Sequence, residues 1–393
     1  MTNKPSPAMP LSHISNNLRL RNLFILFRKE FTFVAFALFL LFAFTFFTRS
    51  NPHSNFHDES HSNSILIPFT PLTNFKQIGA LCLDGSAPGY HFQKGFGSGS
   101  HNCLIYQTYS DFFNWNKVKM RYCDGASFAG HPESEQKGSG LFFRGQIIWE
   151  AIMNELLSIG MSKAKQALLS GCSAGGLATL IHCDNFRQLL PKEATVKCLA
   201  DAGFFLDEKD IIGNSTMRSF YHDVVQLQGV EKSLHKECLA KLEPSKCLFP
   251  SEILKNVKTP VFLVHPAYDF WQIHNILVPQ GSDPRRRWKK CRLNIHSCDA
   301  NLIRTLDSFR SSLLKTVNEF QQRKDIGMFI DSCFIHCQTW MGETWHSPTS
   351  PKIKDKTIAE SVADWFFDRQ VVNLIDCPYP CNPTCHNMDF SRV

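Results

Sequence analysis

LLSGCSAGG, residues 168–176, is the stretch that decides the fold of this chain. An apolar run at 167–169 is typical of a buried strand, and residues 177–181 continue with the apolar spacing of a helix. Strand, Gly-x-Ser-x-Gly and helix in this order form a nucleophile elbow, in which the serine projects from a tight turn. We therefore predict that Ser173 is a nucleophile and that the N–H of Ala174 stabilises an oxyanion. The alternative interpretation is an ordinary glycine-rich turn.

Outside this turn, predicted strands alternate with predicted helices. Strands are expected at 80–85, 103–106, 115–122, 196–199, 259–264 and 327–330. Helices are expected at 144–159, 177–190, 301–320 and 356–367. Residues 204–258 combine helical and loop patterns and are expected to form a cap over the sheet. This alternation predicts an α/β-hydrolase-like fold, with a mostly parallel sheet and helices on both faces.

Two later residues are predicted to complete the chemistry of Ser173. A serine hydroxyl needs an adjacent base, and the base needs an orienting carboxylate. In this architecture they follow in the order Ser, Asp, His, at the ends of later strands. Asp269 and His336 fit both the order and the positions, and His336 lies between Cys333 and Cys337, which would hold its loop rigid.

Several residues compete for these roles. Asp201 also follows a strand and is the alternative acid; its other expected role is to bind loop amides. His265 and His274 flank Asp269, whereas His346 lies in a proline-rich loop, where a lone histidine is usually on the surface. We prefer Asp269 as the acid because the strand before it is stronger.

An apolar block near the N-terminus indicates in which cellular compartment the domain is expected. Residues 31–48 are 18 uncharged residues that follow a basic flank, which is long enough to approach a membrane span. We expect an uncleaved signal-anchor, with 1–30 as a cytosolic basic tail, 49–66 as a stalk and 67–393 as the α/β-hydrolase-like domain in the lumen. A cleaved signal peptide is the alternative. Both place the domain in the secretory pathway, either secreted or as a single-pass type II membrane protein.

The cysteines agree with an oxidising compartment. All 15 lie beyond residue 80, so several disulfides are expected, and the odd count leaves at least one thiol free or paired outside the chain. We predict that Cys172 is a buried structural cysteine and not a nucleophile. Cys377, Cys381, Cys385 and His386 have a spacing that zinc would tolerate, but the prolines among them favour a stapled tail. No metal or cofactor is expected.

The charge distribution indicates which kinds of binding partner the domain is suited to. The net charge is +7, and one dense basic run, RRRWKK at 285–290, is either a solvated loop or a groove for an acidic polymer. Nucleic acid is an improbable partner in the secretory lumen. Asn214 opens an Asn-Ser-Thr sequon and is a predicted glycosylation site. A monomer is expected.

Short motifs stand out along the whole folded part. They are CLDGS at 82–86, GFGSG at 95–99, WNKVK at 115–119, YCDG at 122–125, SGCSAGG at 170–176, DAGFF at 201–205, AYD at 267–269, HCQT at 336–339 and DWFF at 364–367. With them, the chain beyond residue 77 resembles plant pectin acetylesterases, in the family that includes the Notum carboxylesterases. The resemblance implies hydrolysis of acetyl esters on the galacturonan of pectin, with Ser173 as nucleophile, Asp269 as acid and His336 as base.

One departure from the family pattern bears on activity. Such esterases carry a Gly-Gly-Gly-Trp-Cys turn after a strand, and that turn supplies backbone N–H groups to the oxyanion hole. Residues 100–114 contain no glycine, and several dozen family residues are absent near 99–115. The run at 103–106 is the candidate replacement for the missing strand. Losing one donor costs roughly 3–4 kcal/mol, on the order of 10²- to 10³-fold in rate. The alternatives to an active pectin esterase are therefore an inactive pectin-binding short form and a Notum-like protein deacylase.

Overall fold

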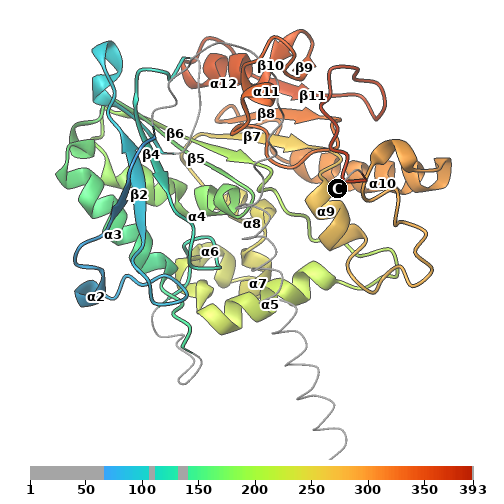
Figure 1. The fold of residues 1–393 in the computed structure, drawn as a ribbon, viewed down its shortest axis with the longest axis horizontal. Coiled ribbons are helices and arrows are strands. Elements are labelled where there is room, and N and C mark those ends of the chain that lie inside the picture. The colour runs from blue at the N-terminus through green and yellow to red at the C-terminus, as the bar shows by residue number, and fades with distance from the viewer. Residues whose placement is uncertain (1–65, 106–110, 132–139, 392–393) are drawn as a thin grey trace, which may run out of the picture. The chain divides into compact units, whose positions relative to one another are not determined.

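The folded part of the chain is built on one large sheet. A computed structural model describes residues 66–105, 111–131 and 140–391. Within these ranges, nine strands form a sheet in the order β1-β2-β4-β3-β5-β6-β7-β8-β11 (Figure 1). Its parallel strands are β4 (Asn116–Met120), β3 (Asn102–Ile105), β5 (Gln166–Cys172), β6 (Thr195–Asp201), β7 (Val261–Pro266), β8 (Ile326–Asp331) and β11 (Asn373–Ile375). Antiparallel strands β2 (Gly89–Gln93) and β1 (Phe69–Pro71) extend one edge.

Alternate side chains of the central strands enter two separate cores, because successive residues of a strand point to opposite faces. In β5, Leu169 joins the core formed with the helices α3 (Gly145–Ser158) and α4 (Ala174–Leu189). Leu168 joins the other core, with α12 (Ile358–Phe366). Figure 1 shows α3 and α4 on one side of the sheet and α12 on the other. The predicted mostly parallel sheet with helices on both faces is confirmed.

Local signals fix the ends of the long helices that follow. Helix α10 (Ala300–Asn318) begins after Asp299, whose carboxylate accepts the N–H groups of two residues in its first turn. Helix α12 begins with a capping box, in which Thr357 and Glu360 each bond the other's backbone N–H. The predicted cap at 204–258 contains α5 (Thr216–Gln228), α6 (Lys236–Leu239), α7 (Pro244–Cys247) and α8 (Pro250–Asn256).

The N-terminal edge of the sheet differs from the expectation. The predicted strand at 80–85 is wrong: this segment is a turn, tied by a disulfide between Cys82 and Cys123 and closed by Gly85 at φ 82°. The strands β1 and β2 were not predicted. β1 is three residues long, too short for an alternating pattern to be recognised.

Strand β3 lies where the family pattern is interrupted. It pairs in parallel with β4 on one side and with β5 on the other, so residues 103–105 of the predicted run do supply a central strand. Cys103 in this strand is buried and is the one free cysteine of the chain, since the other fourteen form seven disulfides. Residues 106–110, which continue from β3, lie outside the described ranges.

The predicted tail, anchor and stalk fall almost wholly outside the described residues. The description starts at Leu66, so the segments 1–30, 31–48 and 49–65 stay predictions. Of the helices in the described ranges, none has both the length and the apolar character that a membrane span requires.

Candidate active site

Ser173 occupies the turn between β5 and α4. Its backbone has φ 58° and ψ −123°, a combination that is rare for a residue with a side chain and is typical of strained functional sites. The turn tolerates no side chain at Gly171, where a Cβ would lie 2.2 Å from the carbonyl oxygen of Gly175. Gly176 is equally constrained, because its Cβ would lie 2.7 Å from the carbonyl oxygen of Asp201. Gly175 itself has open space, so Gly171 and Gly176 are the glycines that this elbow requires.

Ala174 is the first residue of α4, directly after the elbow serine. The first hydrogen bond of the helix runs from the N–H of Leu177 to the carbonyl oxygen of Ser173, at 3.0 Å. The N–H of Ala174 therefore belongs to the first turn, whose donors have no partner within the helix. The oxyanion role of this N–H stays a prediction.

Asp269 and His336 form a hydrogen-bonded pair. Nδ1 of His336 and Oδ2 of Asp269 are 2.7 Å apart, and the carboxylate is buried. The other oxygen, Oδ1, accepts the N–H of Gln272 at 3.0 Å and so caps the short helix α9 (Phe270–Gln272). A carboxylate on Nδ1 selects the tautomer with the proton there, leaving Nε2 as an acceptor. Nε2 is buried, and within the described residues it has no hydrogen-bond partner, so it is not hydrogen-bonded to Ser173 either.

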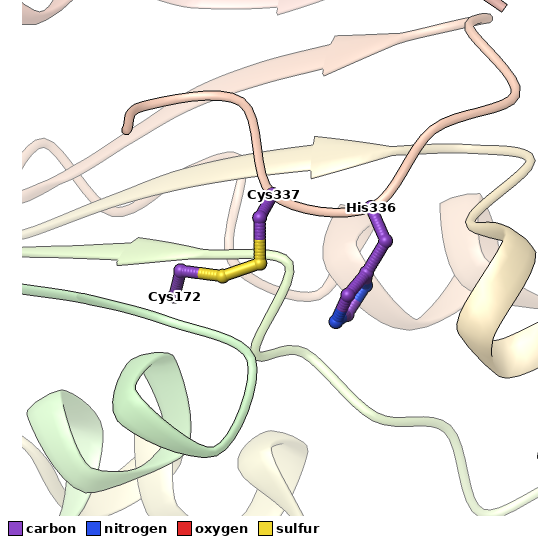
Figure 2. Close-up of side chains that lie close together, drawn as sticks. All are labelled: Cys172, His336 and Cys337. Atoms are coloured by element: carbon purple, nitrogen blue, oxygen red, sulfur yellow. A yellow bond between two sulfur atoms is a disulfide. The ribbon is translucent and has the colours of Figure 1, made fainter. Parts of the chain in front are cut away.

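A disulfide brings the elbow and the histidine loop together. It joins Cys172, the residue before Ser173, to Cys337, the residue after His336, with their Cα atoms 5.6 Å apart. An imidazole nitrogen of His336 lies within 4.8 Å of both sulfur atoms, and Figure 2 shows His336 and Cys337 on one loop, with the disulfide running from Cys337 to Cys172. The elbow and the histidine loop are therefore tied together at the carboxyl ends of the strands. The prediction that Cys172 is buried is wrong: it is half-buried, and its structural role is this covalent link.

The two aromatic residues after Asp269 enclose the imidazole. The ring of Trp271 stacks on His336 with centroids 6.1 Å apart and planes 24° apart. Phe270 meets the same ring edge-on at 5.7 Å. These contacts limit the rotation of the imidazole and keep water from one of its faces. Phe270 and Trp271 were not among the predicted site residues; their place directly after the predicted acid was the available signal.

Asp201 does not bond the imidazole. Its Oδ2 accepts the N–H groups of Gln338 and Thr339 at 2.7 and 2.8 Å, which is the loop-binding role considered for it above. Burial raises the pKa of Asp201 to about 6, against the opposing effect of these donors.

The competing histidines have other partners. His265 is buried beside Nε2 of Gln272, and burial lowers the pKa of His265 to about 4. His274 bonds the carbonyl oxygen of Arg292 through its Nε2. His346 is exposed, as expected for a surface histidine.

Comparisons with known proteins decide the family. The family model described as Pectinacetylesterase matches residues 60–108 and 106–386. The chain belongs to the pectinacetylesterase family. Pectin acetylesterase 5 from Arabidopsis thaliana is 59% identical, over 80% of this chain and 84% of its own length. Pectin acetylesterase 4 from the same plant is 54% identical, over 83% of this chain and 90% of its own length.

More distant relatives share the fold. The human palmitoleoyl-protein carboxylesterase NOTUM is 26% identical, over 70% of this chain and 56% of its own length. The solved structure of the Wnt deacylase Notum from Drosophila superposes with a TM-score of 0.65 at 18% identity and covers 81% of this chain and 99% of its own. The α/β architecture of this pectinacetylesterase family member is therefore also that of Notum.

The remaining predictions concern the surface of the domain. Cys377 pairs with Cys381, and Cys385 pairs with Cys333, as expected for a tail stapled by disulfides. Asn214 is exposed in the turn before α5, which leaves the predicted glycosylation site accessible. A cavity of about 300 Å³ lies at the opposite edge of the sheet, lined by residues that include His101, Asn102 and Lys163, and does not belong to the site of Ser173.

Proposed function

We propose that this chain is a serine ester hydrolase that removes acetyl groups from cell-wall pectin, with Ser173 as nucleophile, His336 as base and Asp269 as acid. The observation that carries the proposal is the 2.7 Å pair of His336 and Asp269, held beside the elbow of Ser173 by the Cys172–Cys337 disulfide. Membership of the pectinacetylesterase family, and relatives named pectin acetylesterase at 54–59% identity, support the substrate class.

The reaction uses the two nitrogens of His336 in different ways. Nε2 takes the proton of Ser173 Oγ as the hydroxyl attacks the acetyl carbonyl carbon. Nδ1 keeps its own proton and donates it in a hydrogen bond to the carboxylate of Asp269. The imidazolium then gives its proton to the sugar oxygen, which leaves as an alcohol. Water then attacks the acetyl-serine and gives a proton to Nε2 of His336. The imidazolium returns that proton to Ser173 Oγ as the acyl–oxygen bond breaks, and acetate is released. The N–H of Ala174 faces the charge that develops on the carbonyl oxygen.

We propose further that turnover is reduced because the glycine-rich oxyanion turn is missing. The family model matches in two pieces that meet at 106–108, directly after β3. The alignment to Pectin acetylesterase 5 runs over 358 positions but covers only 80% of these 393 residues, as expected if the relative has residues that this chain lacks. Both observations support a deletion near 99–115, after a strand that is itself in place.

The basic run at 285–290 supports an acidic polymer as substrate. Arg285, Arg286, Lys289 and Lys290 are exposed, while Trp288 between them is buried and anchors the loop. His274 connects this loop to the site. It bonds the carbonyl oxygen of Arg292 and packs against Phe270, and the ring of Phe270 in turn packs against His336. Figure 1 shows the long connection from α9 to α10 running beside α9.

Reversing the charge of this loop is expected to weaken the reaction on pectin selectively. In the fourfold variant Arg285→Glu, Arg286→Glu, Lys289→Glu, Lys290→Glu, kcat/KM for acetylated pectin should fall by about tenfold or more at low salt, because attraction of the polyanion is lost. kcat/KM for neutral p-nitrophenyl acetate should not change. The matched control carries four Lys→Glu changes at the opposite edge of the sheet, at positions 94, 163, 165 and 192. Equal losses in both variants would contradict a specific role of the basic loop.

The compartment is part of the same proposal. Seven disulfides suit an oxidising environment, and pectin is a component of the cell wall, so we place the domain in the secretory pathway with the cell wall as destination. The N-terminal apolar block at 31–48 would direct it there, as a signal-anchor or as a cleaved signal.

Acetate release from acetylated pectin tests the function. The purified protein is expected to release acetate from acetylated pectin, to leave palmitoleoylated peptide unchanged, and to be labelled on Ser173 by a fluorophosphonate probe. Absence of both labelling and acetate release, with pectin binding retained, would identify an inactive pectin-binding form instead. Faster hydrolysis of the palmitoleoyl ester would identify a Notum-like deacylase.

A further inference from the structure

Asp201 is bonded to both halves of the site at once. Its backbone carbonyl oxygen accepts the N–H of Ser173 at 2.8 Å. Its carboxylate Oδ2 accepts the N–H of Gln338, the N–H of Thr339 and the hydroxyl of Thr339, at 2.7, 2.8 and 2.9 Å. The first bond fixes the elbow, and the other three fix the loop that begins two residues after His336.

The surroundings of Asp201 leave these bonds little freedom. The residue is fully buried and ends β6, where it pairs in register with Cys172 of β5. On the helix side, a Cβ at Gly176 would lie 2.7 Å from the carbonyl oxygen of Asp201, so α4 packs directly on this backbone. Hydrogen bonds are electrostatically stronger in a buried environment than in water.

We propose that Asp201 is a positioning residue, which sets the distance between Ser173 and His336 through its two groups of hydrogen bonds. It acts from the end of β6, and its side chain bonds the backbone of the histidine loop while its interaction with the imidazole of His336 is only electrostatic. The Cys172–Cys337 disulfide joins the same two segments through side chains, whereas Asp201 binds backbone N–H groups of both segments. The proposal rests on the proposed roles of Ser173 and His336.

The proposed role of Asp201 differs from that of the acid, Asp269, because the two carboxylates have different partners. Asp269 accepts a hydrogen bond from Nδ1 of the imidazole, whereas Oδ2 of Asp201 accepts hydrogen bonds from Gln338 and Thr339. An acid orients the tautomer of the base and stabilises the imidazolium, and its amide analogue loses about 10⁴-fold in kcat. A positioning carboxylate needs only an acceptor oxygen, so its amide analogue should retain most of the function.

The test compares three single variants of the full chain with the wild type. Asp201→Ala removes the acceptor, and Asp201→Asn keeps one acceptor oxygen without the charge. Asp210→Ala is the matched control, because Asp210 is also buried and accepts two backbone N–H groups and a threonine hydroxyl, but only within its own turn at 210–216. The readouts are kcat and KM for p-nitrophenyl acetate, the melting temperature, and hydrogen exchange at the amides of Gln338 and Thr339.

Asp201→Ala is expected to lower kcat by roughly 10²-fold, the effect of a misplacement of about 1 Å between reacting groups, with KM changed less than about twofold. Asp201→Asn should stay within about tenfold of the wild type, because an acceptor oxygen remains. Asp210→Ala should lower the melting temperature and leave kcat unchanged. Exchange at Gln338 and Thr339 should accelerate in Asp201→Ala only.

Two results would overturn the proposal. One is a folded Asp201→Ala protein with wild-type kcat, which would reduce Asp201 to a stabilising residue. The other is a 10⁴-fold loss in Asp201→Asn beside a mild effect of Asp269→Asn, which would make Asp201 the acid. If Asp201→Ala does not fold, the comparison of Asp201→Asn with Asp269→Asn still decides whether Asp201 is a positioning residue or the acid. Hydrogen exchange does not depend on turnover, so an inactive wild type would count against the proposed function while the exchange data still judge the bonds of Asp201.

Discussion

Replacing Ser173 with alanine is expected to lower kcat for acetate release by on the order of 10⁴- to 10⁶-fold, to the rate of the buffer control. The reason is that Nε2 of His336 would have no hydroxyl to deprotonate, so no acetyl-enzyme forms. The fold should be retained, because Ser173 makes no side-chain cap of α4 and alanine adds no atoms to the elbow. The measurement is acetate release from acetylated pectin, with fluorophosphonate labelling of the same preparations.

Ser170→Ala is the matched control for this experiment. Ser170 lies three residues earlier in β5, is buried, and in the described part of the chain its hydroxyl has no hydrogen-bond partner. Removing an unpartnered hydroxyl is close to neutral for stability. Ser170→Ala should therefore keep its activity. Labelling that persists in Ser173→Ala at the wild-type level would place the reactive serine elsewhere and overturn the site.

Restoring the glycine-rich turn is expected to raise kcat by roughly 10²- to 10³-fold, the effect of one oxyanion donor. The change is an insertion of the corresponding segment of Pectin acetylesterase 5 from Arabidopsis thaliana between residues 105 and 111, directly after β3. This is a suitable position because β3 already pairs with both β4 and β5, so the graft begins at the end of an intact central strand. The measurement is kcat for p-nitrophenyl acetate and for acetylated pectin.

An insertion of equal length in which the glycines are replaced by alanine serves as control for the graft. It should leave kcat near that of the unmodified chain, because alanine cannot adopt the backbone conformations that turn several N–H groups inward. Wild-type turnover already equal to that of Pectin acetylesterase 5 would contradict the proposal that the missing turn impairs this chain.

Local patterns in the sequence account for most of the architecture. The strand and helix of the elbow were predicted within a few residues of β5 and α4, because an apolar run, tight glycines and a helical spacing occur together there. The strand at 80–85 was wrong because four of its six residues are the apolar and cysteine residues of a disulfide-bonded turn, which a pattern cannot distinguish from a strand. The edge strand β1 pairs with β2, and β2 pairs in turn with β4, and such pairing is not visible in a single chain segment.

The sequence by itself determined which residue types carry the chemistry and in what order, since the nucleophile elbow and the succession Ser173, Asp269, His336 depend only on local turns at the ends of strands. Only the tertiary structure decided their partners. The bond of Asp269 to His336, the Cys172–Cys337 link across 165 positions and the attachment of Asp201 to both loops each join residues from different strands. The physical reason is that such contacts depend on which strands become neighbours when both faces of the sheet are buried together, and the pattern of a single segment does not specify its neighbours.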